Sequence, residues 1–192
     1  MMPKGRYPHK LVVITGPPVS GKSTVANDIV KWLPLKKIIS TTTRSPRSSE
    51  KRGVDYHFIS RSRFDELVEQ GLMFEYNEYS GELYGRQRKD MRRAALEDLV
   101  PLLVVDPNEA LDIQKRHPDA LVLFIKPVSL SVIKQRLTAR GGEIDEINRR
   151  LQLAKEAMSS APVFAYTITN PDGHLDDTLR LVKKTVRGYL GL

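Results

Sequence analysis

Residues 10–24 read KLVVITGPPVSGKST, a short apolar run followed by a loop bounded by Gly16 and Gly21. The apolar run, Lys10–Thr15, has the length and composition of a buried parallel strand. After the loop, Lys22–Leu33 places its apolar residues on one face of a helix that ends at Pro34. A strand, a glycine loop and a helix in this order form the context in which the pattern G-x-x-x-x-G-K-S/T marks a phosphate-binding loop.

The residue types in this loop suit the chemistry of a phosphate chain. Glycines let the backbone curl so that N–H groups and a helix N-terminus converge on the phosphates. Lys22 is expected to reach the β- and γ-phosphates, and the Ser23 hydroxyl to join the shell of a Mg²⁺ ion. We therefore predict a site for ATP with Mg²⁺, formed by Gly16, Pro17, Pro18, Val19, Ser20, Gly21, Lys22, Ser23 and Thr24.

Composition restricts the class of protein. The 192 residues can bury one substantial core, and the absence of cysteine excludes disulfides and thiolate metal sites. No apolar run approaches the roughly 20 residues needed to cross a bilayer, and the basic N-terminus lacks the apolar segment of a signal peptide. The formal net charge is +8, and the arginines and lysines lie in several loops and do not form one polybasic run. We expect a cytoplasmic protein, a monomer or weak homo-oligomer, with neither nucleic acid nor membrane as a partner.

The rest of the chain alternates strand and helix patterns, which predicts a mainly parallel sheet with helices on both faces. The further strands expected in this sheet are Lys37–Ser40, Leu102–Asp106, Leu121–Lys126 and Tyr166–Thr169. Between residues 41 and 86 the rhythm breaks. There, strands at Tyr56–Ile59 and Met73–Tyr79 flank a helix over Arg63–Gln70, for which Ser62 opens a capping-box-like sequence.

Several separate motifs resemble the guanylate kinase family in order, in spacing and in their offset from the phosphate-binding loop. They are STTTRSPR at 40–47, GVDYHF at 53–58, FEY at 74–76, SGELYG at 80–85, RLTARG at 136–141, RRL at 149–151 and TN at 169–170. The resemblance implies an α/β fold of the P-loop NTPase class, with a parallel five-stranded core sheet flanked by helices. It divides this single domain into a core (1–40, 87–136 and 151–192), a small α+β acceptor-binding insertion (41–86) and a helical lid (137–150).

The same resemblance implies a site for the acceptor. The acceptor's phosphate would be held by Ser40, Arg44, Arg47, Tyr56 and Tyr84. Guanidinium forks and hydroxyls suit this task, because together they satisfy a dianionic phosphate with directional, charge-assisted bonds. Glu75 is the candidate for base recognition, since a carboxylate accepts from both N1–H and N2–H₂ of guanine, whereas adenine offers neither donor.

Late arginines form a third group. Arg136 and Arg140 lie four residues apart on one predicted helix, and Arg150 lies in the next helix, after Gly141–Gly142. In the family this region is a lid whose arginines close on the transferring phosphoryl group, which has a loose, anionic transition state. The resemblance thus implies catalytic roles for Lys22, Arg47, Arg136, Arg140 and Arg150. It implies a contact between Asn170 and the adenine of ATP.

The chain departs from the family pattern at two places near the acceptor base. Arg86 stands where the family usually has serine or threonine, a guanine contact. Of the two acids that the family has at the end of the third strand, only Asp106 remains, since the other position is Val104. We still expect Asp106 to contact the acceptor, and to reach Mg²⁺ through water. Arg86 is expected to contact guanine at O6 and N7, a pairing open to a donor-only side chain, or to extend into solvent.

These observations favour a nucleoside monophosphate kinase that moves the γ-phosphoryl of ATP to GMP or dGMP. A kinase of the same fold that acts on another nucleotide or on a ribose bisphosphate is an alternative, which Arg86 and Val104 keep open. A non-catalytic, guanylate-kinase-like module that binds phosphopeptides is a second alternative. The intact Lys22 and Ser23 argue against it.

Overall fold

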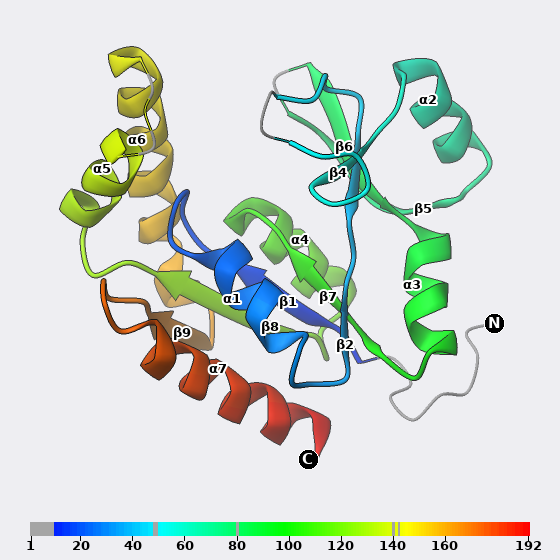
Figure 1. Ribbon diagram of the computed structural model, residues 1–192. Helices are drawn as coiled ribbons and strands as arrows, with labels where there is room; N and C mark the ends of the chain where they lie inside the picture. The colour runs from blue at the N-terminus through cyan, green and yellow to red at the C-terminus, as the bar shows by residue number, and fades with distance from the viewer. Residues whose placement is uncertain (1–9, 48–49, 80, 140, 142) are drawn as a thin grey trace. The chain divides into compact units, whose positions relative to one another are not determined.

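A computed structural model describes residues 10–47, 50–79, 81–139, 141 and 143–192. The chain divides into two compact units (Figure 1). One combines residues 10–37 with Leu102–Leu192, and the other comprises Ile38–Pro101. The second unit contains the whole of the predicted insertion, residues 41–86, together with one more helix.

The first unit is organised by a five-stranded sheet with the order β2-β7-β1-β8-β9. Its strands are β1 (Val12–Thr15), β2 (Leu35–Lys37), β7 (Val100–Val104), β8 (Leu121–Lys126) and β9 (Tyr166–Thr169). The central strand β1 pairs in parallel with β7 and β8, and β8 pairs in parallel with β9. Every residue of β1 is buried, as expected of a parallel strand covered on both faces. The predicted parallel core sheet is therefore confirmed.

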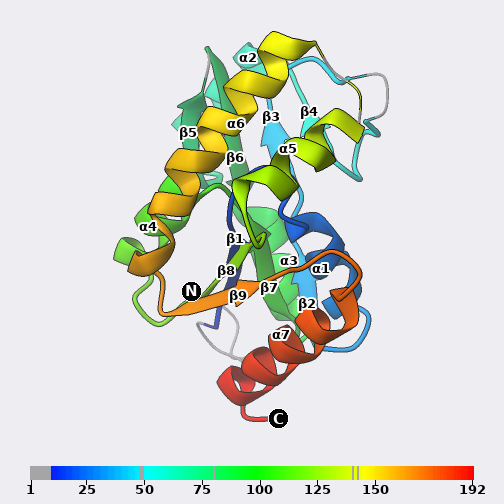
Figure 2. The ribbon, with the colours of Figure 1, turned by 90° about the vertical axis from the view of Figure 1, so that its left-hand side faces the viewer.

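Helices cover both faces of this sheet. The helices of this unit are α1 (Lys22–Ile29), α4 (Pro107–Arg116), α5 (Leu130–Ala139), α6 (Ile144–Ser159), the 3₁₀ turn Ala161–Val163 and α7 (Leu175–Leu190). Figure 2 shows α1 and α7 on one face and α4 on the other. Helices α5 and α6 share a small apolar cluster of Ile133, Leu137 and Ala154. No helix in the described part of the chain is long and apolar enough to span a bilayer.

The second unit contains a four-stranded sheet with the order β4-β3-β6-β5. Its elements are β3 (Ser40–Thr42), β4 (Tyr56–Phe58), α2 (Arg61–Glu69), β5 (Met73–Tyr79), β6 (Glu82–Gln87) and α3 (Arg88–Leu96). Strand β3 pairs in parallel with β4 and antiparallel with β6, which also pairs antiparallel with β5. The buried side chains Phe64, Leu67, Met73 and Leu83 join α2 to this sheet.

The structure differs from the local predictions at several places. The predicted strand Lys37–Ser40 is two short strands, β2 and β3, which belong to different sheets. Strand β6 was not predicted, because a segment with Gly85, Arg86 and Gln87 lacks the regular alternation of a half-buried strand. Helix α2 is capped by Ser60 and not by Ser62, since the Ser60 side chain accepts a hydrogen bond from the Arg63 N–H.

A β-bulge in β5 decides which way Glu75 faces. Met73 is opposite Gln87, whereas Glu75 is opposite the adjacent residue, Arg86, so two residues of β5 match one of β6. Beyond the bulge, the Tyr76 ring packs edge-on against Phe64 of α2, on the same side as the buried Met73. The Glu75 side chain therefore points away from α2, toward the face of the sheet on which the Arg86 side chain lies.

Candidate functional site

The phosphate-binding loop connects β1 to α1, and its two bounding glycines are required by close contacts. A Cβ on Gly16 would lie 2.0 Å from the carbonyl oxygen of Ile125 in β8. A Cβ on Gly21 would lie 2.4 Å from the side-chain nitrogen of Asn170. Gly21 is also the N-cap of α1 and has a φ of 95°, which favours glycine. The predicted loop therefore has the backbone that its glycines imply.

Lys22 is the first residue of α1, and its ammonium folds back over the loop. Its Nζ donates to the carbonyl oxygens of Gly16 and Pro17, each at 2.8 Å. Desolvation by burial lowers the pKa of Lys22 to about 8, against the opposing effect of the Asp106 carboxylate. The loop thus holds a cation that titrates within an experimentally accessible range of pH.

This pKa predicts proton-linked binding of ATP. The terminal phosphate, with a pKa of about 6, is fully ionised at pH 8 and above. Its charge should raise the pKa of Lys22, so ATP should bind with uptake of a proton at pH 8 and above. Because a proton is taken up on binding, the Kd for ATP should rise with pH in this range, by at most about tenfold per pH unit. Calorimetry in two buffers of different ionisation enthalpy measures the uptake. A Lys22→Met control should lose it, and a Kd unchanged between pH 7 and pH 9 would contradict the assignment.

Two residues are candidates to bind a Mg²⁺ ion. Ser23 follows Lys22 in the first turn of α1, and its side chain is exposed. Asp106 follows β7, is exposed, and caps α4 by accepting from the Glu109 N–H at 2.9 Å. The described residues contain no group of three or more His, Cys, Asp or Glu that could hold a metal ion by itself. A hydroxyl and a carboxylate nevertheless suit Mg²⁺ carried by a nucleotide, because such an ion takes most ligands from phosphates and water.

The structure brings several predicted phosphate ligands together in the second unit. The Arg44 guanidinium lies over the Tyr56 ring, 5.6 Å from its centre, and the rings of Tyr56 and Tyr84 meet edge-on at 6.1 Å. Ser40 is the register partner of Tyr56 in the β3–β4 pair. Burial raises the pKa of Tyr56, so its hydroxyl keeps its proton and remains a donor at neutral pH.

Glu50 joins this group and was missed from the sequence. Its two carboxylate oxygens accept from Arg44 Nη2 at 2.8 and 2.9 Å, and one of them also accepts from the Arg47 N–H at 2.8 Å. Nη1 of the Arg47 guanidinium lies 3.9 Å from Glu50 Oε1, and the Arg47 side chain is 60% exposed. The signal in the sequence was an acid three residues after Arg47 in a basic loop. Glu50 orders Arg44, whereas Arg47 remains accessible to solvent.

Glu75 and Arg86 form a buried ion pair. Arg86 Nη1 lies 2.5 Å from Glu75 Oε1, and both side chains are 3% exposed. The alternative that Arg86 extends into solvent is therefore wrong. That both residues contact guanine stays a prediction.

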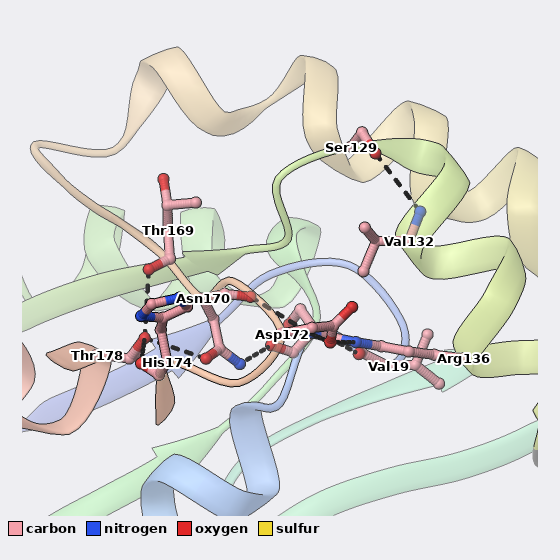
Figure 3. A network of polar contacts seen from close by, with 10 residues as sticks. Val19, Ser129, Val132, Arg136, Thr169, Asn170, Asp172, His174 and Thr178 are labelled. Carbon is pink, nitrogen blue, oxygen red and sulfur yellow. Dashed lines mark hydrogen bonds and ion pairs between the residues drawn. The ribbon is translucent and has the colours of Figure 1, made fainter. Parts of the chain in front are cut away.

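The late residues of the predicted site have different environments. Arg136 is bonded to the phosphate-binding loop and to the segment after β9, as Figure 3 shows. Asn170 is buried, and its side-chain amide bonds to the Ser20 carbonyl. Arg150 is partly exposed and donates to Glu146 at 2.7 Å. Arg140 lies outside the described residues.

A parallel sheet with a phosphate-binding loop after its central strand defines a P-loop protein. The family model of guanylate kinase matches residues 8–189. A guanylate kinase of Thermus thermophilus is 38% identical over 162 residues, which cover 84% of this chain and 74% of the relative. A guanylate kinase of Nostoc sp. PCC 7120 is 37% identical over 165 residues, covering 85% of this chain and 83% of the relative. The chain therefore belongs to the guanylate kinase family.

A solved structure agrees with this assignment. The crystal structure of guanylate kinase from Anaplasma phagocytophilum superimposes with a TM-score of 0.73 at 27% sequence identity. The match covers 93% of this chain and 84% of that chain. It therefore includes both the five-stranded sheet unit and the second, mixed-sheet unit.

Proposed function

We propose that the protein transfers the γ-phosphoryl group of ATP to GMP or dGMP, which yields ADP and GDP or dGDP. The observation that carries the proposal is the intact phosphate-binding loop, with Lys22 at the start of α1, in a chain that matches the guanylate kinase model over residues 8–189. Because ATP and GMP are metabolites of the cytoplasm, we place the reaction there.

The residues have separate tasks in the proposed reaction. The loop from Gly16 to Thr24 holds the phosphates of ATP, and Ser23 and Asp106 hold Mg²⁺, directly and through water. When bound there, Mg²⁺ would neutralise charge on the β- and γ-phosphates. Lys22, Arg47, Arg140 and Arg150 supply positive charge to the loose, anionic transition state. No general base is needed, since the attacking phosphate oxygen is already deprotonated at neutral pH.

The acceptor is held through its phosphate and through its base. Ser40, Arg44, Arg47, Tyr56 and Tyr84 bind the phosphate, and the cluster of Arg44 with the two tyrosines supports this part. Glu75 accepts from N1–H and N2–H₂ of guanine, and Arg86 donates to O6 and N7. The bond between Arg86 and Glu75 Oε1 must therefore shift when guanine enters.

A coupled assay of ADP release tests the acceptor directly. We expect kcat/KM for GMP and dGMP to exceed the value for AMP by about ten- to a hundredfold, because adenine turns its 6-amino donor toward Arg86 and leaves Glu75 without donors. CMP, UMP and ribose 1,5-bisphosphate complete the panel. A higher kcat/KM for any of these compounds than for GMP would show that this compound, and not GMP, is the acceptor. GMP binding without turnover of any acceptor would favour the non-catalytic binding module.

A further inference from the structure

Val19, in the phosphate-binding loop, has a strained backbone. Its φ is 51°, in the left-handed region that a β-branched residue seldom adopts. Its side chain packs against the apolar cluster of Ile133, Leu137 and Ala154, which α5 and α6 share. A strained conformation persists only where its surroundings determine it, so other contacts must fix Val19 in place.

Arg136 of α5 provides the polar part of that restraint. Its Nη1 donates to the Val19 carbonyl at 3.0 Å, and its Nη2 to the Asn170 carbonyl at 3.3 Å. Its Nε and Nη2 also donate to one oxygen of Asp172, at 3.0 and 2.5 Å. All three guanidinium nitrogens are thus bonded within the protein (Figure 3).

Asn170 restrains the next peptide unit of the loop. Its Nδ2 donates to the Ser20 carbonyl at 2.8 Å, while its Oδ1 accepts from the Thr178 hydroxyl at 3.0 Å. In a planar trans peptide the C=O and the following N–H point in opposite directions. Asn170 therefore fixes the direction of the Gly21 N–H through the Ser20 carbonyl, from the side opposite to that N–H.

We propose that Arg136, Asp172 and Asn170 form a brace that sets the phosphate-binding loop in its anion-binding conformation, with Arg136 acting on ATP through Val19. Arg136 is then a positioning residue and not a catalytic one, and Asp172 orients its guanidinium. The brace holds the carbonyls of Val19 and Ser20 outward, which leaves N–H groups of the loop to face a phosphate chain. The inference rests on the proposed ATP site but not on the identity of the acceptor.

The test compares Asp172→Ala in two backgrounds, wild type and Val19→Gly. Glycine adopts a positive φ without strain, so the loop of the Val19→Gly protein should not need the brace at this position. In the wild-type background, Asp172→Ala should raise the Kd for ATP, measured by calorimetry, by about five- to a hundredfold. In the Val19→Gly background, Asp172→Ala should raise the Kd for ATP by less than about twofold. The Kd for GMP should be unaltered in all four proteins.

Matched variants separate the brace from a general effect of charge or folding. Asp177→Ala removes a carboxylate of similar exposure from α7, 57% against 60% for Asp172, and should leave the Kd for ATP unchanged. Asp172→Glu keeps a carboxylate and should recover most of the binding. If Val19→Gly does not fold, Val19→Asn serves the same purpose, because asparagine also tolerates the left-handed region.

Two outcomes would overturn the proposal. One is an Asp172→Ala protein that binds ATP as tightly as the wild type. The other is a rise in the Kd for ATP on Asp172→Ala that is equally large with valine and with glycine at position 19. That result would mean that Asp172 does not act through the strained residue. A wild-type protein that fails to bind ATP at all would instead refute the proposed function.

Discussion

Replacing Lys22 with alanine is expected to lower kcat by about 10²–10³-fold, with a smaller change in the KM for GMP. The ammonium lies over the loop, bonded to the Gly16 and Pro17 carbonyls, and ATP phosphates would replace these neutral partners. Its charge should matter most as the γ-phosphoryl leaves, since negative charge then spreads over the transferring group. Steady-state kinetics with ATP and GMP measure the effect.

Lys31→Ala is the matched control for this experiment. Lys31 lies just beyond the end of α1, its side chain is 67% exposed, and its ion pair with Asp28 spans 4.0 Å. Loss of an exposed charge of this kind should leave kcat within about twofold of the wild type. Circular dichroism should show both variants folded. A folded Lys22→Ala protein that keeps most of its turnover would remove the basis for the proposed reaction.

Single substitutions in the Glu75–Arg86 pair are expected to destabilise the protein by about 3–5 kcal/mol each. Both side chains are 3% exposed, so Arg86→Ala leaves a buried carboxylate without its counter-charge, and Glu75→Ala leaves a buried guanidinium. Replacing both with apolar residues of similar volume, Glu75→Leu with Arg86→Met, should restore much of that stability. Urea unfolding of the four proteins measures the free energies.

The double variant separates folding from recognition of the base. Because it is expected to fold while lacking both polar groups, its preference for GMP over AMP in kcat/KM should fall by about ten- to a hundredfold. Arg61→Ala, which breaks an ion pair with Glu78 in which both side chains are 54% exposed, should cost no more than about 1 kcal/mol. Single variants of Glu75 and Arg86 as stable as Arg61→Ala would contradict the buried pair.

Much of the core could be predicted from the sequence because its signals are local. Strand β8 has the predicted bounds, since an apolar run of this length between helices favours a buried parallel strand. The edge strand β9 also has its predicted bounds, although only Ile168 of its four residues is buried. The phosphate-binding loop was predictable because glycine and lysine at fixed spacing follow from the geometry of a phosphate chain. Strand β5 also has its predicted bounds, Met73–Tyr79.

The rest depends on contacts between residues far apart in the chain. Charged residues are seldom fully buried, so nothing local indicates that Arg86 lies 3% exposed against Glu75. A valine predicts an extended backbone, and the positive φ of Val19 is understandable only with Arg136 and α5 in place. Glu50 looked like one more loop acid until its bond to Arg44 was known.

The bulge in β5 also limits how this protein can change in the course of evolution. Deleting Phe74 would remove the bulge and leave Met73 opposite Gln87 and Glu75 opposite Arg86 in regular alternation, so the carboxylate would still face Arg86. The extra residue of the bulge can thus be lost without a reversal of the strand, whereas a one-residue insertion or deletion beyond Glu75 would turn the following side chains to the opposite face. Among descendants of this sequence, loss of Phe74 should therefore be tolerated more often than loss or gain of a residue between Glu75 and Tyr79.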